Sequence, residues 1–141
     1  MTETANPYQL EEQVGYWLRL ASQRHTMIFA ALMSQNLTPM QFSTLIRLAE
    51  NEQCSQNQLG RLAGMDVATI KGVVDRLVQK NLIQTKPDQH DKRRSVISLL
   101  DAGKELVASL HDLGAQITAE TMEPLTAAEQ KVLLKLLKKI A

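Results

Sequence analysis

Apolar residues recur every three or four positions along most of the chain, and this spacing predicts amphipathic α-helices. Over about residues 8–34 the stripe contains Leu10, Val14, Leu18, Ala21, Ile28 and Leu32, with His25 as its one polar member. Stripes over about residues 102–122 and 127–140 contain Leu106, Leu110, Leu113 and Ile117, then Leu133, Leu136, Leu137 and Ile140. Both flanks of the chain are therefore predicted to be long helices, each with one apolar face.

Capping residues mark the starts of four helices. Three stretches, beginning at Thr38, Ser55 and Thr126, have the Ser/Thr-x-x-Glu/Gln form of a capping box. Asp66 is placed to cap a fourth helix that opens at Val67. Each cap contributes about 1 kcal/mol, so we expect a mainly α-helical fold.

Residues 55–80 predict two short helices joined by a turn at residues 64–66. Gly64 can adopt the left-handed conformation that ends a helix. In the second helix Ile70, Val74 and Leu77 face inward. This is the layout of a helix-turn-helix, whose second helix can enter a DNA major groove, although a helical hairpin without a ligand has the same spacing.

The outer face of the second helix offers small and basic residues. Ala68 and Thr69 occupy its first turn, where a reading helix meets bases, while Lys71 and Arg76 can neutralise phosphates. Gly72 lies mid-helix, where glycine costs up to about 1 kcal/mol relative to alanine. Its missing side chain suits either a close approach to DNA or tight packing against a neighbouring helix.

Two β-prone runs, residues 82–86 and 94–99, are separated by turn-forming residues and predict a β-hairpin. A hairpin that follows a helix-turn-helix is a wing. Its tip contains Lys92, Arg93 and Arg94, which can reach the DNA backbone or the minor groove. Asp91 lies two residues before Arg93 and is placed to hold its guanidinium group.

The net charge of +1 conceals an uneven distribution. Residues 61–94 hold eight Lys or Arg and four Asp or Glu, a surplus of +4, whereas the remainder of the chain is acidic. A local surplus of basic residues of this kind is typical of a surface that binds the phosphate backbone of a nucleic acid. At 141 residues the chain fits one ordinary domain, or a small module with helical extensions.

Several classes of protein are disfavoured. Cys54 is the single cysteine, which excludes an intramolecular disulfide and a multi-cysteine zinc site. No H-x-x-x-H motif or Gly-rich phosphate loop is present, so we expect neither an enzyme nor a metal or cofactor protein. The polar N-terminus and the lack of an 18-residue apolar run predict a cytoplasmic protein without a membrane segment.

Two stretches resemble the MarR family of winged helix-turn-helix transcription regulators. They are DVATIKGVVDRLVQKNLI, and DKRRSVISLLDAGKEL, which is similar to the family's D-x-R followed by a strand, a helix start and a glycine. The likeness extends over residues 38–105 and in outline over the whole chain. It implies a homodimer on a pseudo-palindromic double-stranded operator, usually a repressor released by a small aromatic or phenolic ligand.

The resemblance matches Asp91 and Arg93 to the family's wing pair and residues 67–80 to its recognition helix. The candidate DNA-binding residues are Ser55, Gln56, Ala68, Thr69, Lys71, Gly72, Arg76, Asp91, Lys92, Arg93 and Arg94. Two positions depart from the family pattern. Gly72 stands where members often have an arginine, so Lys71 is our substitute for reading guanine, and Leu100 replaces a capping threonine, a role we assign to Asp101.

The flanking helices point to dimerisation without help from the family. A winged-helix lobe of about 65 residues does not need three further amphipathic helices, and a second copy is the simplest cover for their apolar faces. We expect an interface made by Leu10, Val14, Leu113, Ile117, Leu133, Leu136, Leu137 and Ile140. The chain then divides into an N-terminal dimerisation helix (1–36), a DNA-binding lobe (37–100) and C-terminal dimerisation helices (101–141).

A ligand site is predicted where the family places its pocket, between the first helix, the dimer helices and the lobe. The candidates are Tyr16, Trp17, Arg19, His25, Phe42 and Ile46, which suit a carboxylate or phenolate on an aromatic ring. A histidine on an apolar face can equally be a satisfied core residue. Three alternatives stay open: oxidation sensing through Cys54, a winged helix that binds protein, and an architectural DNA binder without an effector.

Overall fold

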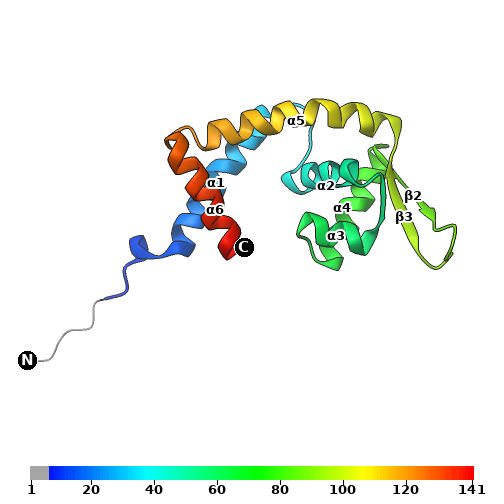
Figure 1. Cartoon of the computed structure of the whole chain (residues 1–141), viewed down its shortest axis with the longest axis horizontal. Coiled ribbons are helices and arrows are strands. Elements are labelled where there is room, and N and C mark those ends of the chain that lie inside the picture. Colours follow the sequence, from blue (N-terminus) through cyan, green and yellow to red (C-terminus); the bar gives the residue numbers. More distant parts are fainter. Residues whose placement is uncertain (1–6) are drawn as a thin grey trace, which may run out of the picture.

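The computed structural model describes residues 7–141 as a mainly helical chain with one small antiparallel sheet (Figure 1). The elements, in order, are η1 (Leu10–Glu12), α1 (Val14–Leu32), α2 (Pro39–Glu50), β1 (Gln53–Ser55), α3 (Gln56–Ala63), α4 (Val67–Gln79), β2 (Ile83–Pro87), β3 (Ser95–Leu99), α5 (Asp101–Thr121) and α6 (Ala127–Ile140). This confirms the predicted fold class, a winged helix-turn-helix lobe with helical flanks. Residues 1–6 of the predicted segment 1–36 lie outside the described residues.

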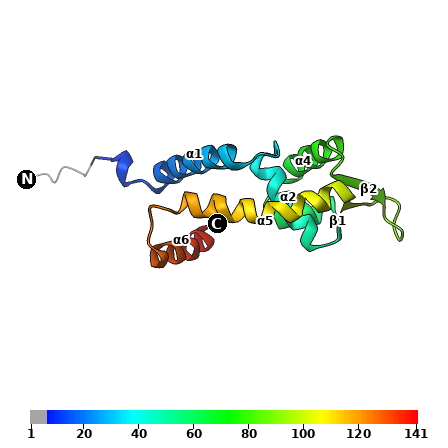
Figure 2. The same ribbon diagram turned by 90° about the horizontal axis from the view of Figure 1, so that it is seen from above.

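The two ends of the molecule have different architectures. α2, α3, α4 and the sheet form a lobe at one end, whereas α1 and α6 lie at the other (Figure 1). α5 runs along both parts, and the view from above shows it crossing α2 before it reaches α6 (Figure 2). None of the helices in residues 7–141 is both long and apolar enough to cross a lipid bilayer.

The predicted caps form with one exception. Thr38 and Thr126 close complete capping boxes, and Ser55 Oγ accepts a hydrogen bond from the Gln58 amide at 3.2 Å. Asp66 caps α4 through the Thr69 amide at 2.7 Å. Our assignment of Asp101 as the cap of α5 is wrong, because Leu100 occupies that position without a side-chain hydrogen bond and Asp101 is already helical.

The first helix is shorter than the periodicity predicts. Gln13 adopts an extended conformation that separates the short turn η1 from α1. The Trp17 indole donates a hydrogen bond to the Glu11 carbonyl at 2.6 Å and so holds the turn against the helix. Apolar spacing alone does not detect such a break, because Leu10 and Val14 remain four residues apart.

The predicted wing is confirmed as the hairpin of β2 and β3, with Ile83 opposite Leu99 and Pro87 opposite Ser95. A third strand, β1, pairs with the other edge of β3 and gives the order β1-β3-β2. Cys54 of β1 lies opposite Ile97, and both side chains are buried. Three residues are too few for a period-two pattern, so the sequence did not predict this strand.

The core lies where α2, α3, α4, the sheet and α5 meet. Its fully buried apolar side chains are Leu45, Leu48, Leu59, Ile70, Leu77, Ile83, Ile97 and Leu110. Leu110 belongs to α5, so the helix after the wing completes the core as well as leading away from it. Burial of this set fixes the orientation of α4 relative to the wing.

Apolar residues outside the core are concentrated on the N-terminal and C-terminal elements. Leu10, Val14, Leu133, Leu136 and Ile140 are exposed in the single chain, and no residue of α6 is buried. These exposures are compatible with the predicted interface, which stays a prediction.

Ile117 is a correction to that predicted interface. Its side chain is only 3% exposed because it belongs to the core of its own chain. It therefore has almost no surface left to offer a partner. Leu113 and Leu137 are half-buried.

Candidate nucleic-acid interface

The turn between α3 and α4 presents α4 on the surface of the lobe. Gly64 ends α3 with φ of +71°, the left-handed conformation that its sequence position predicted. In α4, Ile70, Val74 and Leu77 are buried, while Ala68 and Arg76 point outward. One face of α4 therefore anchors the helix and the other is free to read a ligand.

Gly72 is not required by packing within the chain. A Cβ atom built at this position would have no neighbouring atom within 4 Å. Packing against a neighbouring helix, one of the two explanations that the sequence left open, is thereby excluded for the described residues. Gly72 leaves an open surface on the outward face of α4.

The Lys71 side chain of α4 is held only by an exposed ion pair with Asp75. Lys71 Nζ lies 3.1 Å from Asp75 Oδ2, one helical turn along, and both side chains are more than half exposed. An exposed ion pair of this kind contributes about 1 kcal/mol or less. Lys71 can therefore exchange Asp75 for a base edge or a phosphate at little cost.

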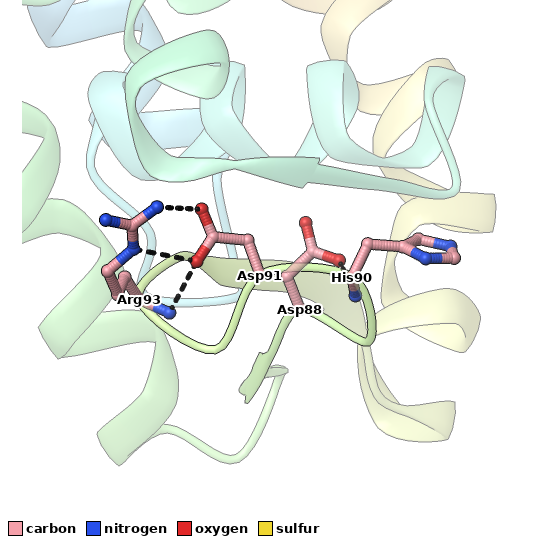
Figure 3. A network of polar contacts seen from close by, with 4 residues as sticks. All are labelled: Asp88, His90, Asp91 and Arg93. Carbon is pink, nitrogen blue, oxygen red and sulfur yellow. Dashed lines mark hydrogen bonds and ion pairs between the residues drawn. The ribbon is translucent and has the colours of Figure 1, made fainter.

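The wing tip holds one arginine in a defined position. Asp91 Oδ1 accepts hydrogen bonds from the Arg93 amide at 3.0 Å and from Nε at 3.1 Å, while Oδ2 accepts one from a terminal guanidinium nitrogen at 3.3 Å (Figure 3). The hydrogen bonds from the Arg93 side chain, then those from its backbone, lower the pKa of Asp91. The predicted pairing of Asp91 with Arg93 is thus confirmed. The Arg93 side chain nevertheless remains 90% exposed.

The turn itself is built by short polar contacts. Asp88 Oδ1 accepts a hydrogen bond from the His90 amide at 2.9 Å, and the Asp88 amide donates to the Arg94 carbonyl at 2.9 Å. Figure 3 shows the His90 ring directed away from Asp91 and Arg93. The loop conformation therefore comes from Asp88 and Asp91, which leaves the basic side chains pointing outward.

A notch of about 290 Å³ separates the wing from the start of α3. Its lining brings together four candidate DNA-binding residues from separate parts of the sequence, Ser55, Gln56, Arg93 and Arg94, with Asn57 and Ser95. The first amide groups of a helix and two guanidinium groups favour an anion. This notch therefore has the chemistry of a phosphate contact.

A second hollow of about 540 Å³ lies between the start of α2 and the outward face of α4. Its lining residues are Thr38, Pro39, Met40, Gln41, Ala68, Thr69, Gly72, Val73 and Arg76. The sequence did not indicate Pro39 or Met40 as site residues, because both residues also fit the first turn of the helix that Thr38 caps. Only the tertiary contact between α2 and α4 reveals them.

The ligand candidates make three separate contacts at different points along α1. Tyr16 packs edge-on against Trp17, and the Arg19 guanidinium lies 5.7 Å from the Tyr16 ring centre. Phe42 makes an edge-on contact with Phe29 of α1. Ile46 packs against the core.

His25 makes the third contact, with α5. Its Nδ1 lies 2.9 Å from Thr121 Oγ1, and that hydroxyl donates to the Ile117 carbonyl at 2.8 Å. Because this hydrogen bond uses the hydroxyl proton, the geometry favours His25 Nδ1 as the donor to Thr121 Oγ1. In the neutral ring Nε2 then presents a lone pair as a hydrogen-bond acceptor.

Arg24 was not among the candidates, although it makes the same connection between α1 and α5. Its guanidinium donates to the carbonyls of Thr121 and Glu120, the latter at 3.0 Å. Arg24 lies close to His25 in the sequence, but the sequence pattern gives no sign of this partner. Together with His25, it ties α1 to the C-terminal end of α5.

Cys54 lies in a poor environment for sensing oxidants. Its side chain is buried in β1, and burial raises the pKa of the thiol. A thiol with a raised pKa contains little of the reactive thiolate near neutral pH. These facts argue against Cys54 as an oxidation sensor.

Comparisons with known proteins agree with this surface. A model described as MarR family matches residues 35–94. The chain is 38% identical over 135 residues to the HTH-type transcriptional repressor NicR of Pseudomonas putida, an alignment covering 95% of this chain and 85% of NicR.

Two solved structures are similar over nearly the whole chain. A probable transcriptional regulator from Pseudomonas aeruginosa superposes with a TM-score of 0.92 and 42% identity, covering 94% of this chain and 100% of that one. BpsR of Bordetella bronchiseptica, whose DNA binding is regulated by 6-hydroxynicotinic acid, superposes with a TM-score of 0.91 and 34% identity, covering 96% and 97%.

Proposed function

Because the chain belongs to the MarR family of winged helix-turn-helix transcription regulators, we propose that it is a homodimeric repressor whose operator binding is released by a small aromatic acid. The observation that supports DNA binding most directly is the notch between α3 and the wing. It gathers Ser55, Gln56, Arg93 and Arg94 beside the helix-turn-helix. In this arrangement α4 reads the major groove while the notch grips one phosphate.

The dimer follows from the uncovered faces of the flanking helices. α6 contributes no buried residue to its own chain, yet exposes Leu133, Leu136 and Ile140. Contiguous exposed apolar surface of this kind is a mark of a protein interface. A two-fold axis at these helices places two α4 helices on successive major grooves, so the operator is expected to be pseudo-palindromic.

Replacing Arg93 by Ala is expected to weaken binding to all duplexes alike, because Arg93 contacts the backbone and not a base. Loss of one phosphate contact lowers the slope of log affinity against log salt by about 0.9 per half-site. The measurement is a gel-shift or fluorescence titration over a range of salt concentrations. Arg47→Ala is the matched control, since Arg47 is also an exposed arginine paired with a nearby carboxylate, Glu50, at 3.1 Å.

A sequence-dependent loss in Arg93→Ala would contradict this role, because it would make Arg93 a base-reading residue. An unchanged salt slope would remove the wing from the interface. Replacing Thr69 or Lys71, by contrast, is expected to change which bases are preferred.

The proposed effector is an aromatic acid, for which 6-hydroxynicotinic acid is the first probe because it regulates BpsR. The proposed pocket lies where α1 meets α5, near His25. With Nδ1 committed to Thr121, Nε2 can accept a hydrogen bond from a hydroxyl or ring N–H of the ligand. Arg19, which lies against Tyr16, can approach the carboxylate.

The function is tested by selecting bound duplexes from a random pool, with and without a panel of aromatic acids. We expect a pseudo-palindromic site whose recovery falls when 6-hydroxynicotinic acid or a related acid is added. His25→Gln and Arg19→Ala are expected to weaken binding of the acid by calorimetry while operator affinity is retained. If no sequence is enriched, the proposed repressor function is wrong. If a sequence is enriched but none of the acids changes its recovery, only the proposed effector is wrong.

A further inference from the structure

The hollow between α2 and α4 has an apolar interior at the edge of the reading surface. Pro39 and Met40 form its α2 side, and Ala68, Gly72 and Val73 form its α4 side. The two helices lie close together in the lobe (Figure 1). Thr69 and Arg76, both candidate DNA-binding residues, line the same hollow, so it is continuous with the proposed DNA interface.

Two features of this hollow have no explanation within the folded chain. Gly72 leaves open space where any other residue would place a Cβ atom, although a mid-helix glycine destabilises a helix relative to alanine. Met40 is a large apolar residue, yet it is 51% exposed. Both features are accounted for if an apolar group from outside the chain enters the hollow.

DNA offers one apolar group in the major groove, the C5-methyl group of thymine. Ala68 and Gly72 are one turn apart, so they form a continuous stripe of minimal side chains along α4. A base edge can approach this stripe more closely than it can approach any longer side chain. Met40 then supplies the opposite wall for a methyl group.

We infer that this hollow receives the methyl group of one thymine in each operator half-site and so determines sequence preference at that position. The inference rests on the proposed function, because it places α4 in the major groove. It differs from a phosphate contact, which carries no sequence information. It also assigns base reading to Gly72 and Met40, neither of which has a polar side chain.

The test replaces each thymine of the selected operator by deoxyuridine, which removes the methyl group and leaves the hydrogen-bonding edge unchanged. At one position per half-site, wild-type affinity is expected to fall about 4-fold, the equivalent of one buried methylene-sized group, and about 16-fold when both half-sites are changed. At the other positions we expect less than about a 2-fold effect.

Two variants assign the effect to the hollow. Gly72→Leu fills it, and Met40→Gln makes its wall polar without requiring any change in the core. In both, the ratio of thymine to deoxyuridine affinities is expected to fall to about 1 at the sensitive position. Ala108→Leu, which adds the same side chain at an exposed position of α5, should keep the wild-type ratio.

The outcomes separate the two proposals. If the operator is bound selectively but deoxyuridine is tolerated at every thymine, the hollow is not a thymine site and the repressor proposal stands. An unchanged thymine preference in Met40→Gln and Gly72→Leu also overturns the inference, because the methyl group must then be read elsewhere. If no duplex is bound selectively, the proposed function fails and this inference fails with it.

Discussion

Replacing Gly103 by Ala is expected to destabilise the chain by about 3 kcal/mol, the upper part of the range for overpacked sites. A Cβ atom at Gly103 would lie 2.2 Å from the Leu82 carbonyl oxygen, a backbone atom that no rotamer change can move. That oxygen also accepts a hydrogen bond from the Leu100 amide at 3.0 Å. Relief of the clash therefore requires α5 to shift and the hydrogen bond to break or lengthen.

The change is measured by urea denaturation, with attention to whether the transition stays cooperative. Gly15→Ala is the matched control, because Gly15 also lies in the first turn of a helix but has no atom within 4 Å of a built Cβ. We expect Gly15→Ala to be neutral or slightly stabilising. A Gly103→Ala variant within about 0.5 kcal/mol of the wild type would show that α5 does not press against Leu82 in solution.

The destabilisation bears on function because α5 joins the DNA-reading lobe to the proposed dimer helices. Gly103 lies at the point where α5 leaves the sheet, and Leu110, further along the same helix, is fully buried in the core. A shift at Gly103 changes the direction of the whole helix. In a dimer this would alter the spacing between the two α4 helices and lower operator affinity.

Local signals made much of this fold predictable. Capping chemistry acts over three or four residues, so Thr38, Asp66 and Thr126 reveal their helices directly. The wing was predictable for the same reason, since Asp91 and Arg93 are two residues apart and their contact forms within one turn. Features whose partners lie within a turn of each other could therefore be read from the sequence.

Features that depend on distant partners could not. β1 is a strand only because β3 lies beside it. Ile117 is buried because neighbouring elements pack over it, although in the sequence it does not differ from the other apolar residues of its helical stripe. Arg24 meets Glu120 and Thr121 across 96 and 97 residues of sequence. The same holds for the hollow at Gly72, whose other wall belongs to α2.

The division between α5 and α6 leads to the largest expected effect on function. α5 is anchored in its own chain by Leu110, whereas no residue of α6 is fully buried there. In the single chain the apolar face of α6 is exposed to water, and we expect a second copy of the chain to cover it. A substitution on this face can separate dimerisation from folding, because the lobe does not depend on α6.

Replacing Leu136 by Asp is expected to convert the proposed dimer to a monomer and to reduce operator affinity at least about 100-fold. Leu136 is 51% exposed in the single chain, so the substitution costs little there. In the proposed dimer the substitution would bury an unpaired carboxylate and remove an apolar anchor, which together exceed about 3 kcal/mol, or about two powers of ten in the dissociation constant. Analytical ultracentrifugation measures the mass, and gel shift measures operator binding.

Ala127→Asp is the control for charge, because Ala127 is exposed and lies nine residues before Leu136, half a turn round α6, so its substitution adds the same carboxylate on the opposite side of the helix from Leu136. It is expected to remain dimeric and to bind the operator normally. Leu136→Asp should also keep the thermal unfolding profile of the lobe, since no residue of α6 belongs to the hydrophobic core of the described residues. A Leu136→Asp protein that sediments as a dimer and binds with wild-type affinity would place the interface elsewhere, and the two α4 helices would then need another element to set their spacing on DNA.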